Sequence, residues 1–236
     1  MPLQTAKLLK KIDLTNDVIE LSFEPNAPFS FQAGQFISIK VVDNPASPVI
    51  RGYSISSKPA LDSSNFELCI KIVENGRGSN WLNSLKPNDE IQFLGPTGKF
   101  VFDETFTGTS LFIATGTGIS PLKAMIEDQL LNKNTTRKIH LLFGVRYISG
   151  VFYGEIFKNL ATKFPNFTYE LTISRPEKED YTGNKGRVTD LLRNQQLDPA
   201  STKAYMCGLK EMIVEVSTIL DQKGLPKDCV LFEQYD

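Results

Sequence analysis

The stretch SLFIATGTGISPLKAMIEDQLL, residues 110–131, decides the expected fold. It opens with the apolar strand SLFIAT and ends with the helical stretch PLKAMIEDQLL, and the glycine turn of Gly116 and Gly118 separates the two. Pro121 is tolerated in the first helical turn because its missing N–H would be free there anyway. A strand, a glycine turn and a helix in this order are typical of a parallel sheet that binds a dinucleotide pyrophosphate. The third glycine of the usual fingerprint is missing, and tight packing alone is the alternative explanation of the glycines.

The chain around this stretch continues to alternate strands and helices, which predicts a parallel sheet covered by helices on both faces over residues 106–236. The expected strands are 139–145, 169–174, 203–207 and 229–235, and the expected helices lie near 153–163, 187–195 and 209–223.

The chain before residue 106 has a different pattern, in which short strands are broken by Gly, Pro and Asn. One short helix is expected at 79–85, with Ser79 as its N-cap. This pattern suggests a β-barrel or sandwich as a separate domain over residues 1–105. The expected strands are 5–13, 17–24, 35–42, 50–57, 66–73 and 90–94.

The composition excludes several classes of function. With 26 basic and 27 acidic residues the net charge is −1, which gives no support to nucleic acid or an anionic membrane as a partner. No apolar run approaches the ~20 residues of a membrane span, and the N-terminus lacks the apolar core of a signal peptide, so a cytoplasmic location is expected. Three scattered cysteines and one histidine, His140, argue against a disulfide framework, a metal site and a histidine triad.

RGYS, residues 51–54, is the first candidate site. Alternation along a strand puts Arg51 and Tyr53 on one side and Ser54 on the other. Arginine can clamp a phosphate with two hydrogen bonds, tyrosine can stack on a ring, and serine can donate to a ring nitrogen. An ordinary strand with a surface arginine fits these four residues as well.

ENGRGSNWL, residues 74–82, is the second candidate site. Gly76 and Gly78 allow close approach of a ligand to the backbone, and the following helix directs free N–H groups outward, so this turn suits an anion. Lys71 adds a positive charge nearby. A plain glycine turn is the alternative.

The C-terminal part adds two further stretches, YMCGLKEM (205–212) and the final FEQYD. Cys207 and Gly208 at the end of a strand would let a flat ring lie close to the backbone. Glu233 and Tyr235 share one face of the last strand. A buried cysteine and simple completion of the sheet are the alternatives.

Taken together and in this order, the segments resemble the ferredoxin–NADP⁺ reductase family over essentially the whole chain. The resemblance is closest to the plant-type branch, in ELCIKIV, GRGSNWLNSLKPNDEI, GPTGKF, TGTGISP and YMCGLK. It implies an antiparallel β-barrel that binds FAD, followed by a parallel α/β domain that binds NADP(H). It also implies an enzyme that transfers hydride between NADPH and FAD and passes single electrons to ferredoxin, flavodoxin or another redox protein.

The resemblance also implies residue roles. In the flavin site, Arg51 holds the pyrophosphate, Tyr53 stacks on the isoalloxazine ring and Ser54 forms a hydrogen bond with the N5 atom of that ring. The implied catalytic residues are Ser54, Cys207, Glu233 and Tyr235, and Tyr235 also covers the flavin. The other flavin residues are Gly52, Cys69, Ile70, Lys71, Gly78 and Ser79. The residues that bind the nicotinamide nucleotide are Gly116, Thr117, Gly118, Gly208 and Leu209. Four more residues lie where the family contacts the 2′-phosphate of NADP: Ser174, Arg175, Lys185 and Arg187. Because an arginine at this point favours that phosphate, NADPH is expected as the coenzyme over NADH.

The segment ENGRG is shorter than in the plant enzymes, where an insertion helps hold the adenosine of FAD. FMN or an exchangeable flavin therefore stays open as an alternative. So do two other functions: an NAD(P)H:flavin reductase that releases reduced flavin, and an electron-transfer subunit of a larger complex. Asp236 follows the terminal aromatic residue, another difference from plant-type chains.

Overall fold

A computed structural model describes residues 2–178 and 180–235, so the expectation for Asp236 lies outside the described residues. The chain divides into two compact units. The first unit contains the chain up to Phe102 together with Lys123–Asp128. The second contains Asp103–Leu122 and the chain from Gln129 onwards.

The first unit is a six-stranded antiparallel sheet in the order β4-β3-β6-β1-β2-β5. Among the described residues, the two edge strands β4 and β5 are not hydrogen-bonded as a ladder; an isolated bridge, between Ile55 and Leu68, joins the chain after β4 to β5. The expected antiparallel β-domain is therefore confirmed as a six-stranded sheet, and no ladder closes it into a barrel within the described residues. Its elements are β1 (Gln4–Asp13), β2 (Val18–Pro25), β3 (Phe36–Val41), β4 (Val49–Ser54), β5 (Phe66–Lys71), α1 (Arg77–Ser84) and β6 (Glu90–Thr97).

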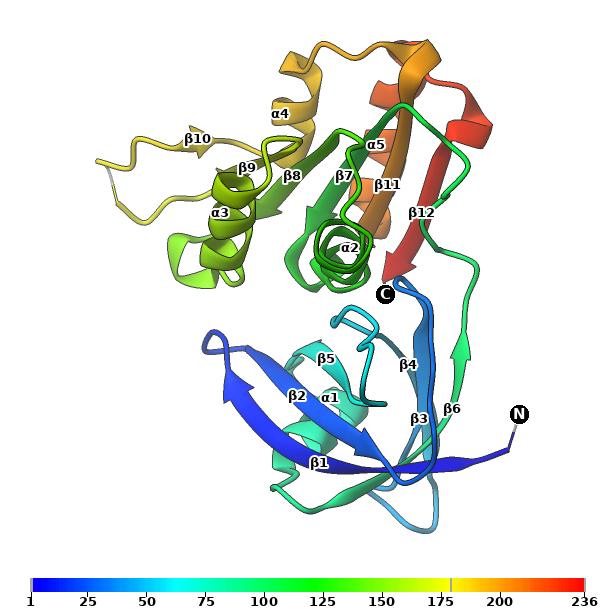
Figure 1. The fold of residues 1–236 in the computed structure, drawn as a ribbon. Coiled ribbons are helices and arrows are strands. Elements are labelled where there is room, and N and C mark those ends of the chain that lie inside the picture. Colours follow the sequence, from blue (N-terminus) through cyan, green and yellow to red (C-terminus); the bar gives the residue numbers. More distant parts are fainter. Residues whose placement is uncertain (1, 179, 236) are drawn as a thin grey trace. The chain divides into compact units, whose positions relative to one another are not determined.

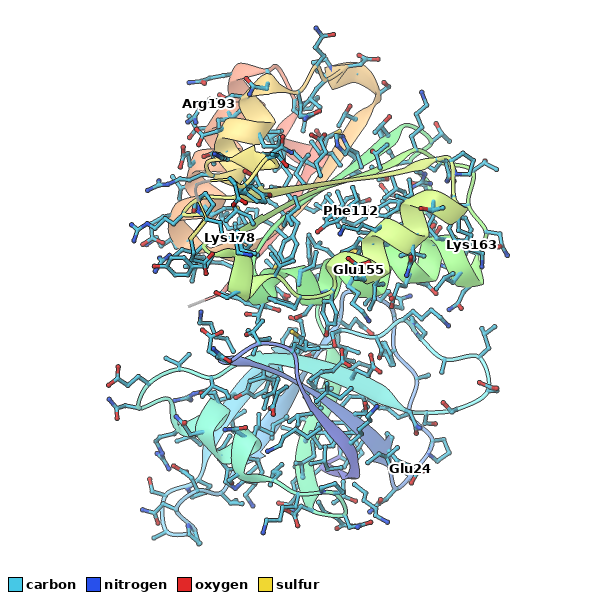
Figure 2. The ribbon with its side chains drawn as sticks, turned by 90° about the vertical axis from the view of Figure 1, so that its left-hand side faces the viewer. Glu24, Phe112, Glu155, Lys163, Lys178 and Arg193 are labelled. Carbon is cyan, nitrogen blue, oxygen red and sulfur yellow. The ribbon has the colours of Figure 1, made fainter. Side chains whose placement is uncertain are left out.

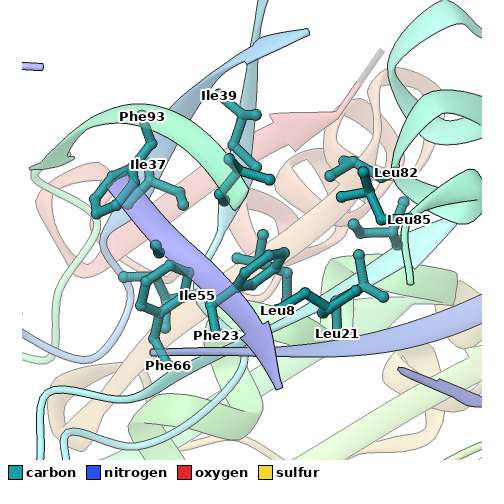
Figure 3. Packing of buried hydrophobic residues seen from close by; sticks show 14 of the residues in the cluster. Leu8, Leu21, Phe23, Ile37, Ile39, Ile55, Phe66, Leu82, Leu85 and Phe93 are labelled. Atoms are coloured by element: carbon teal, nitrogen blue, oxygen red, sulfur yellow. The ribbon is translucent and has the colours of Figure 1, made fainter. Parts of the chain in front are cut away.

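The core of this unit is built from the inward-facing side of each strand, because alternate side chains point to opposite faces of a sheet. In β3, for example, Ile37 and Ile39 are fully buried. Phe66 and Phe93 pack edge to face with ring centroids 5.6 Å apart. Leu82 of α1 adds to the same cluster, so the helix is held against the sheet (Figure 3).

The second unit is a six-stranded parallel sheet in the order β10-β9-β8-β7-β11-β12, as the alternation of strands and helices predicts (Figure 1). Its strands are β7 (Thr109–Thr115), β8 (Ile139–Val145), β9 (Phe167–Ile173), β10 (Asn184–Lys185), β11 (Thr202–Leu209) and β12 (Val230–Tyr235). Its helices are α3 (Gly154–Lys163), α4 (Val188–Asn194) and α5 (Lys210–Gln222), and α2 (Ile119–Glu127) begins in this unit.

Helices cover both faces of this sheet. On one face, α4 and α5 pack on Leu111 and Ile113 of β7. On the other face, Phe157 of α3 contacts Phe167 and Tyr169 of β9. Figure 2 shows α3 and α4 on opposite sides of the layer that carries Phe112. The apolar side chains on each face of the sheet are therefore buried under helices, α4 and α5 on one face and α3 on the other.

Several of the sequence-based assignments differ from the structure. The strand expected at 50–57 ends at Ser54, and the helix expected at 79–85 begins at Arg77 with Gly76 as N-cap, so the prediction of Ser79 as N-cap is wrong. The end of the helix expected at 121–131 is a separate π-helical turn, Asp128–Asn132. The two-residue strand β10 has too little sequence pattern to be predicted.

No helix in the described part of the chain is long and apolar enough to cross a membrane.

Candidate functional site

The RGYS residues lie at the end of edge strand β4, where β4 pairs with β3. Ser54 is buried, Tyr53 is half-buried and Arg51 is exposed. Arg51 and Tyr53 project to the same side of the strand, because the side chains of both reach Gly78 at the start of α1. The structure therefore brings together the first two candidate sites.

Gly78 lacks a side chain where there is no room for one. A Cβ atom on Gly78 would lie 2.5 Å from the Tyr53 hydroxyl oxygen and 3.2 Å from Cγ of Arg51. Burial raises the pKa of Tyr53 to about 12, and the nearby charge of Arg51 opposes this only in part. Tyr53 is therefore a neutral, packed aromatic side chain at neutral pH.

Ser79 closes the turn before α1. Its hydroxyl oxygen accepts a hydrogen bond from the Val73 amide at 3.1 Å and its hydroxyl donates to the Gly76 carbonyl at 3.3 Å. The side-chain amide nitrogen of Asn80 donates to the same carbonyl at 2.8 Å. These side chains fix the turn, while the first backbone N–H groups of the helix have no partner within the helix itself. Such a terminus favours an anion.

Arg77, which lies within ENGRGSNWL, pairs with Asp43, and the motif does not reveal this pair. The guanidinium of Arg77 donates to both carboxylate oxygens of Asp43, at 2.7 and 2.6 Å, and to the Ser47 carbonyl at 2.6 Å. This pair ties the loop before β4 to the first turn of α1. Because Asp43 and Arg77 are 34 positions apart, no local pattern could have found the pair.

Strand β5 carries Cys69, Ile70 and Lys71. The first two side chains are buried, and Lys71 is exposed and forms an ion pair with Asp17 at 3.1 Å. Burial alone would raise the pKa of Asp17, but the hydrogen bond from Lys71 and further bonds hold it below its usual value. If Lys71 contacts a phosphate, its ammonium must either leave Asp17 or bind Asp17 and the phosphate together.

The glycine turn after β7 lies in the second unit and packs directly on the end of β11. Gly116 has a φ of +52°, a conformation that favours glycine. A Cβ atom on Gly118 would lie 2.3 Å from the Cys207 carbonyl oxygen, and one on Gly208 would lie 2.6 Å from Oγ1 of Thr115. The predicted loop residues and the predicted nicotinamide pocket are therefore neighbours in this unit.

Cys207, Glu233 and Tyr235 also meet there. Cys207 lies opposite Glu233 in the pairing of β11 with β12, and Leu209 opposite Tyr235. Burial and then the charge of Glu233 raise the pKa of the Cys207 thiol well above its usual value, while a hydrogen bond with Tyr235 has the opposite effect. The thiol is therefore protonated at neutral pH and is no nucleophile.

The residues expected near a 2′-phosphate are brought together only in part. Lys185 pairs with Ile173 next to Ser174, and the Arg175 amide donates to the Arg146 carbonyl at 2.7 Å. Arg187 instead forms an ion pair with Glu215 of α5 at 3.8 Å.

Glu177 is a further residue that sequence reasoning missed in this region. Its carboxylate accepts hydrogen bonds from the Ile148 amide at 2.7 Å and the Ser149 hydroxyl at 2.6 Å, which links the loops after β8 and β9.

Among the described residues, no three His, Cys, Asp or Glu side chains gather in a way that could hold a metal ion. His140 pairs with Glu170 at 2.7 Å on the parallel sheet.

These two surfaces fit a flavin and a nicotinamide nucleotide. The first offers a cation, a half-buried aromatic ring and a helix start with no Cβ in the way at Gly78. The second has a glycine turn between a parallel strand and a helix, a setting that suits a pyrophosphate. Hydrogen-bond donors and flat surfaces are what such cofactors need from a protein, because the cofactor supplies the electron chemistry.

Comparison with known families agrees with this division. The oxidoreductase FAD-binding domain model matches residues 5–102, and the oxidoreductase NAD-binding domain model matches residues 112–218. The fold and these matches define a flavoenzyme oxidoreductase.

Among curated relatives, ferredoxin–NADP reductase B of Sorangium cellulosum is 34% identical over 98% of this chain and 97% of its own length. A component of the Na⁺-translocating NADH-quinone reductase of Psychrobacter arcticus is 30% identical over 83% of this chain, which spans about half (51%) of that relative. Among solved structures, the ferredoxin–NADP⁺ reductase of Plasmodium falciparum with 2′P-AMP has a TM-score of 0.81 at 27% identity, over 98% of this chain and 95% of that one. The chain belongs to the ferredoxin–NADP reductase family.

Proposed function

We propose that this protein oxidises NADPH, transfers the hydride to a bound FAD and passes single electrons to ferredoxin, flavodoxin or a similar redox protein in the cytoplasm. Residues 1–105 would form the FAD-binding domain and residues 106–236 the NAD(P)-binding domain. The observation that carries the proposal is the full-length match to a relative named ferredoxin–NADP reductase, at 34% identity and 98% coverage.

For the flavin, the proposal assigns binding to the surface around Gly78. Arg51 and the first N–H groups of α1 would hold the pyrophosphate, since both favour a phosphate. Tyr53 would stack on the ring and Ser54 would donate to N5. Gly52, Cys69, Ile70, Lys71 and Ser79 complete the assigned flavin residues. A bound flavin can take up two electrons from a nicotinamide and release them singly.

For the nucleotide, the proposal assigns Gly116, Thr117 and Gly118 to the loop that approaches the coenzyme. Gly208 and Leu209, with the Cys207 thiol as a small neutral neighbour, would bind the nicotinamide. Glu233 would supply a carboxylate near that ring, and Tyr235 an aromatic cover for the flavin.

NADPH is the proposed coenzyme. Arg175 lies just after β9, where an arginine favours the additional 2′-phosphate. Ser174, Lys185 and Arg187 complete the proposed contacts. The relative from Psychrobacter is named as part of an NADH-quinone reductase, so NADH is the competing coenzyme.

A second candidate function has its own support. Because the Psychrobacter relative is named as a subunit and this chain spans only 51% of it, a second proposal is that this chain serves as the reductase part of a larger assembly. Reduction of soluble ferredoxin by the isolated chain distinguishes the two candidates.

The test is a steady-state assay of purified, FAD-loaded protein with NADPH and a low-potential ferredoxin or flavodoxin. The proposal expects acceptor reduction that depends on both NADPH and the protein. NADPH oxidation that requires a large excess of free flavin, with no transfer to either redox protein, would instead indicate a flavin reductase.

A further inference from the structure

Lys123 is a buried lysine to which the proposed function assigns no role. It lies on α2 and is 4% exposed. Its ammonium is 3.1 Å from a carboxylate oxygen of Glu127, one turn along the helix, and 3.7 Å from one of Glu67 on β5. A lysine is rarely so buried unless it is paired, and here two carboxylates face it.

The charge of Lys123 persists at neutral pH. Burial alone would lower the pKa of Lys123, but Glu127 and Glu67 outweigh burial and raise it. Glu20 of β2, which is 9% exposed, contributes a further negative charge. An ammonium ion held in this way has a fixed position, since each of its N–H groups needs an acceptor.

One of these acceptors is a backbone carbonyl. The Nζ atom of Lys123 lies 3.2 Å from the carbonyl oxygen of Ser56, and this hydrogen bond is buried. Ser56 follows Ser54, the last residue of β4, by two positions. Lys123 thus contacts the backbone directly after the strand to which flavin binding is assigned.

Two more hydrogen bonds hold the same piece of backbone. The Ile55 amide donates to the Gln35 carbonyl at 3.0 Å, and the Ser56 amide donates to the Glu67 carbonyl at 2.8 Å. These bonds and the one from Lys123 restrain the chain where it leaves β4. All the residues involved belong to the first unit.

We propose that Lys123 is a positioning residue for the flavin: its ammonium holds the Ser56 carbonyl and thereby sets the position of the Ser54 hydroxyl at the end of β4. This inference rests on the proposed function, because it takes Ser54 to be the group that contacts the flavin. Lys123 itself does not touch the cofactor.

The physical reason lies in the cost of an unpaired buried carbonyl. A hydrogen bond from a charged donor contributes more free energy than one from a neutral donor. A buried acceptor that loses its donor costs a similar amount of free energy. Without Lys123 the Ser56 carbonyl would have to turn toward another donor or toward water. We expect part of this change to reach Ser54, because only Ile55 separates the two residues, although the amide hydrogen bonds of Ile55 and Ser56 remain.

The test uses the full chain and three substitutions at this cluster. Lys123→Met keeps the length of the side chain but removes its donors, whereas Lys123→Arg keeps a cation. Because Lys123→Met removes the cationic partner of the half-buried carboxylates of Glu127 and Glu67, it is paired with the double variant K123M/E127M. Replacing Lys123 and its nearest carboxylate by apolar side chains relieves that penalty for Glu127, whereas Glu67 stays in place, and Ser56 is still left without its donor.

The measurements are the FAD dissociation constant, the absorption spectrum of the bound flavin and its midpoint potential. We expect Lys123→Met and the double variant to weaken FAD binding about tenfold or more, the factor that corresponds to about 1.4 kcal/mol of a charged hydrogen bond. We also expect a shifted spectrum and potential. Lys123→Arg should restore all three measurements.

Ile91→Ala is the matched control, since Ile91 is a buried core residue of the same sheet, 1% exposed, and is not part of this hydrogen-bond set. It should lower the melting temperature and leave the FAD affinity and spectrum unchanged while the protein is folded. Wild-type affinity, spectrum and potential in the double variant would overturn the inference. So would an equal loss of affinity in Ile91→Ala.

Failure of the inference is distinguishable from failure of the proposed function. If the wild-type protein binds no FAD, the proposed function fails. If the wild-type protein binds FAD and the Lys123 variants bind it equally well, only the role of Lys123 is wrong.

Discussion

The hydroxyl oxygen of Tyr53 lies 2.5 Å from the position that a Cβ atom would take on Gly78. Real Cβ contacts are not that short, so any larger residue at position 78 must displace the tyrosine. This relationship links the two N-terminal motifs into one surface, although Tyr53 and Gly78 are 25 positions apart in the sequence.

Gly78→Ala should therefore weaken flavin binding. The new methyl group would push the Tyr53 ring out of its position, and aromatic contacts depend on that position. We expect the FAD dissociation constant to rise about tenfold, which corresponds to about 1.4 kcal/mol. Fluorescence titration with FAD measures it.

Gly150→Ala is the control for this substitution, because a Cβ atom on Gly150 meets nothing within 4 Å. It should bind FAD like the wild type. Equal FAD affinity in Gly78→Ala and the wild type would show that the ring of Tyr53 has no part in binding.

Gly118→Ala should disturb the nucleotide surface instead. Its Cβ atom would lie 2.3 Å from the Cys207 carbonyl oxygen and 2.8 Å from the Gly208 amide nitrogen, and backbone atoms of a central strand have little freedom to move. A clash of this kind typically costs about 1–3 kcal/mol, so a melting temperature lower by at least about 2 °C is expected.

The Michaelis constant for NADPH should also rise in Gly118→Ala, whereas FAD affinity should stay close to that of the wild type. Kinetics at a temperature where the variant is fully folded provide the measurement. A variant with unchanged Michaelis constant and unchanged melting temperature would contradict the close packing of this turn on β11.

Asp103→Asn should destabilise the protein in a pH-dependent way. Hydrogen bonds from Lys203 and Thr105 hold the pKa of Asp103 below its usual value, against the effect of burial. An unfolded aspartate has a pKa of about 3.9. Because the folded-state pKa is lower, the carboxylate stabilises the fold fully above about pH 5, and this contribution is lost as the pH falls through the folded-state pKa.

The expected loss of unfolding free energy in Asp103→Asn is about 1 kcal/mol at pH 7 and shrinks toward zero in strong acid. Urea unfolding of wild type and variant at several pH values, from neutral down to the most acidic at which the wild type stays folded, provides the comparison. A difference that stays constant over this whole range would exclude the Asp103 carboxylate as its source.

Arg175→Ala tests the choice of coenzyme. If this side chain binds the 2′-phosphate, its loss should raise the Michaelis constant for NADPH about tenfold or more, since a charged hydrogen bond contributes about 1.5–3 kcal/mol. The Michaelis constant for NADH should stay nearly unchanged, because NADH has no 2′-phosphate. Arg193→Ala is a suitable control, because Arg193 is tied to Asp190 and Glu215 on α4 and α5. A parallel change for both coenzymes would indicate a general effect on folding.

Much of the fold follows from local sequence patterns. The apolar strand before Gly116 and the helix after it predict a parallel sheet, because periodicity and turn residues are local properties. The same holds for the antiparallel strands of the first half. The prediction of Ser79 as an N-cap is wrong because the N-cap is Gly76, three residues earlier, and the Ser79 hydroxyl bonds to the Val73 amide and the Gly76 carbonyl instead.

The pairs that shape the candidate site are a different matter. Arg77 with Asp43, and Lys123 with the Ser56 carbonyl, join residues 34 and 67 positions apart. Their formation depends on how strands and helices pack, which no local pattern encodes. A lysine inside the apolar run PLKAMI is the one sequence signal that a buried charge partner exists.

The most direct test of the central claim is an anaerobic titration of the purified, FAD-incubated protein with NADPH, followed by absorption. We expect a yellow protein whose flavin band bleaches with about one equivalent of NADPH, because hydride transfer carries two electrons to one flavin. The band should return when an excess of oxidised ferredoxin or flavodoxin is added, because each acceptor molecule takes one electron at a time and the reduced flavin holds two. A colourless protein that retains no flavin after incubation, or a flavin band that neither NADPH nor NADH bleaches, would contradict the proposed function.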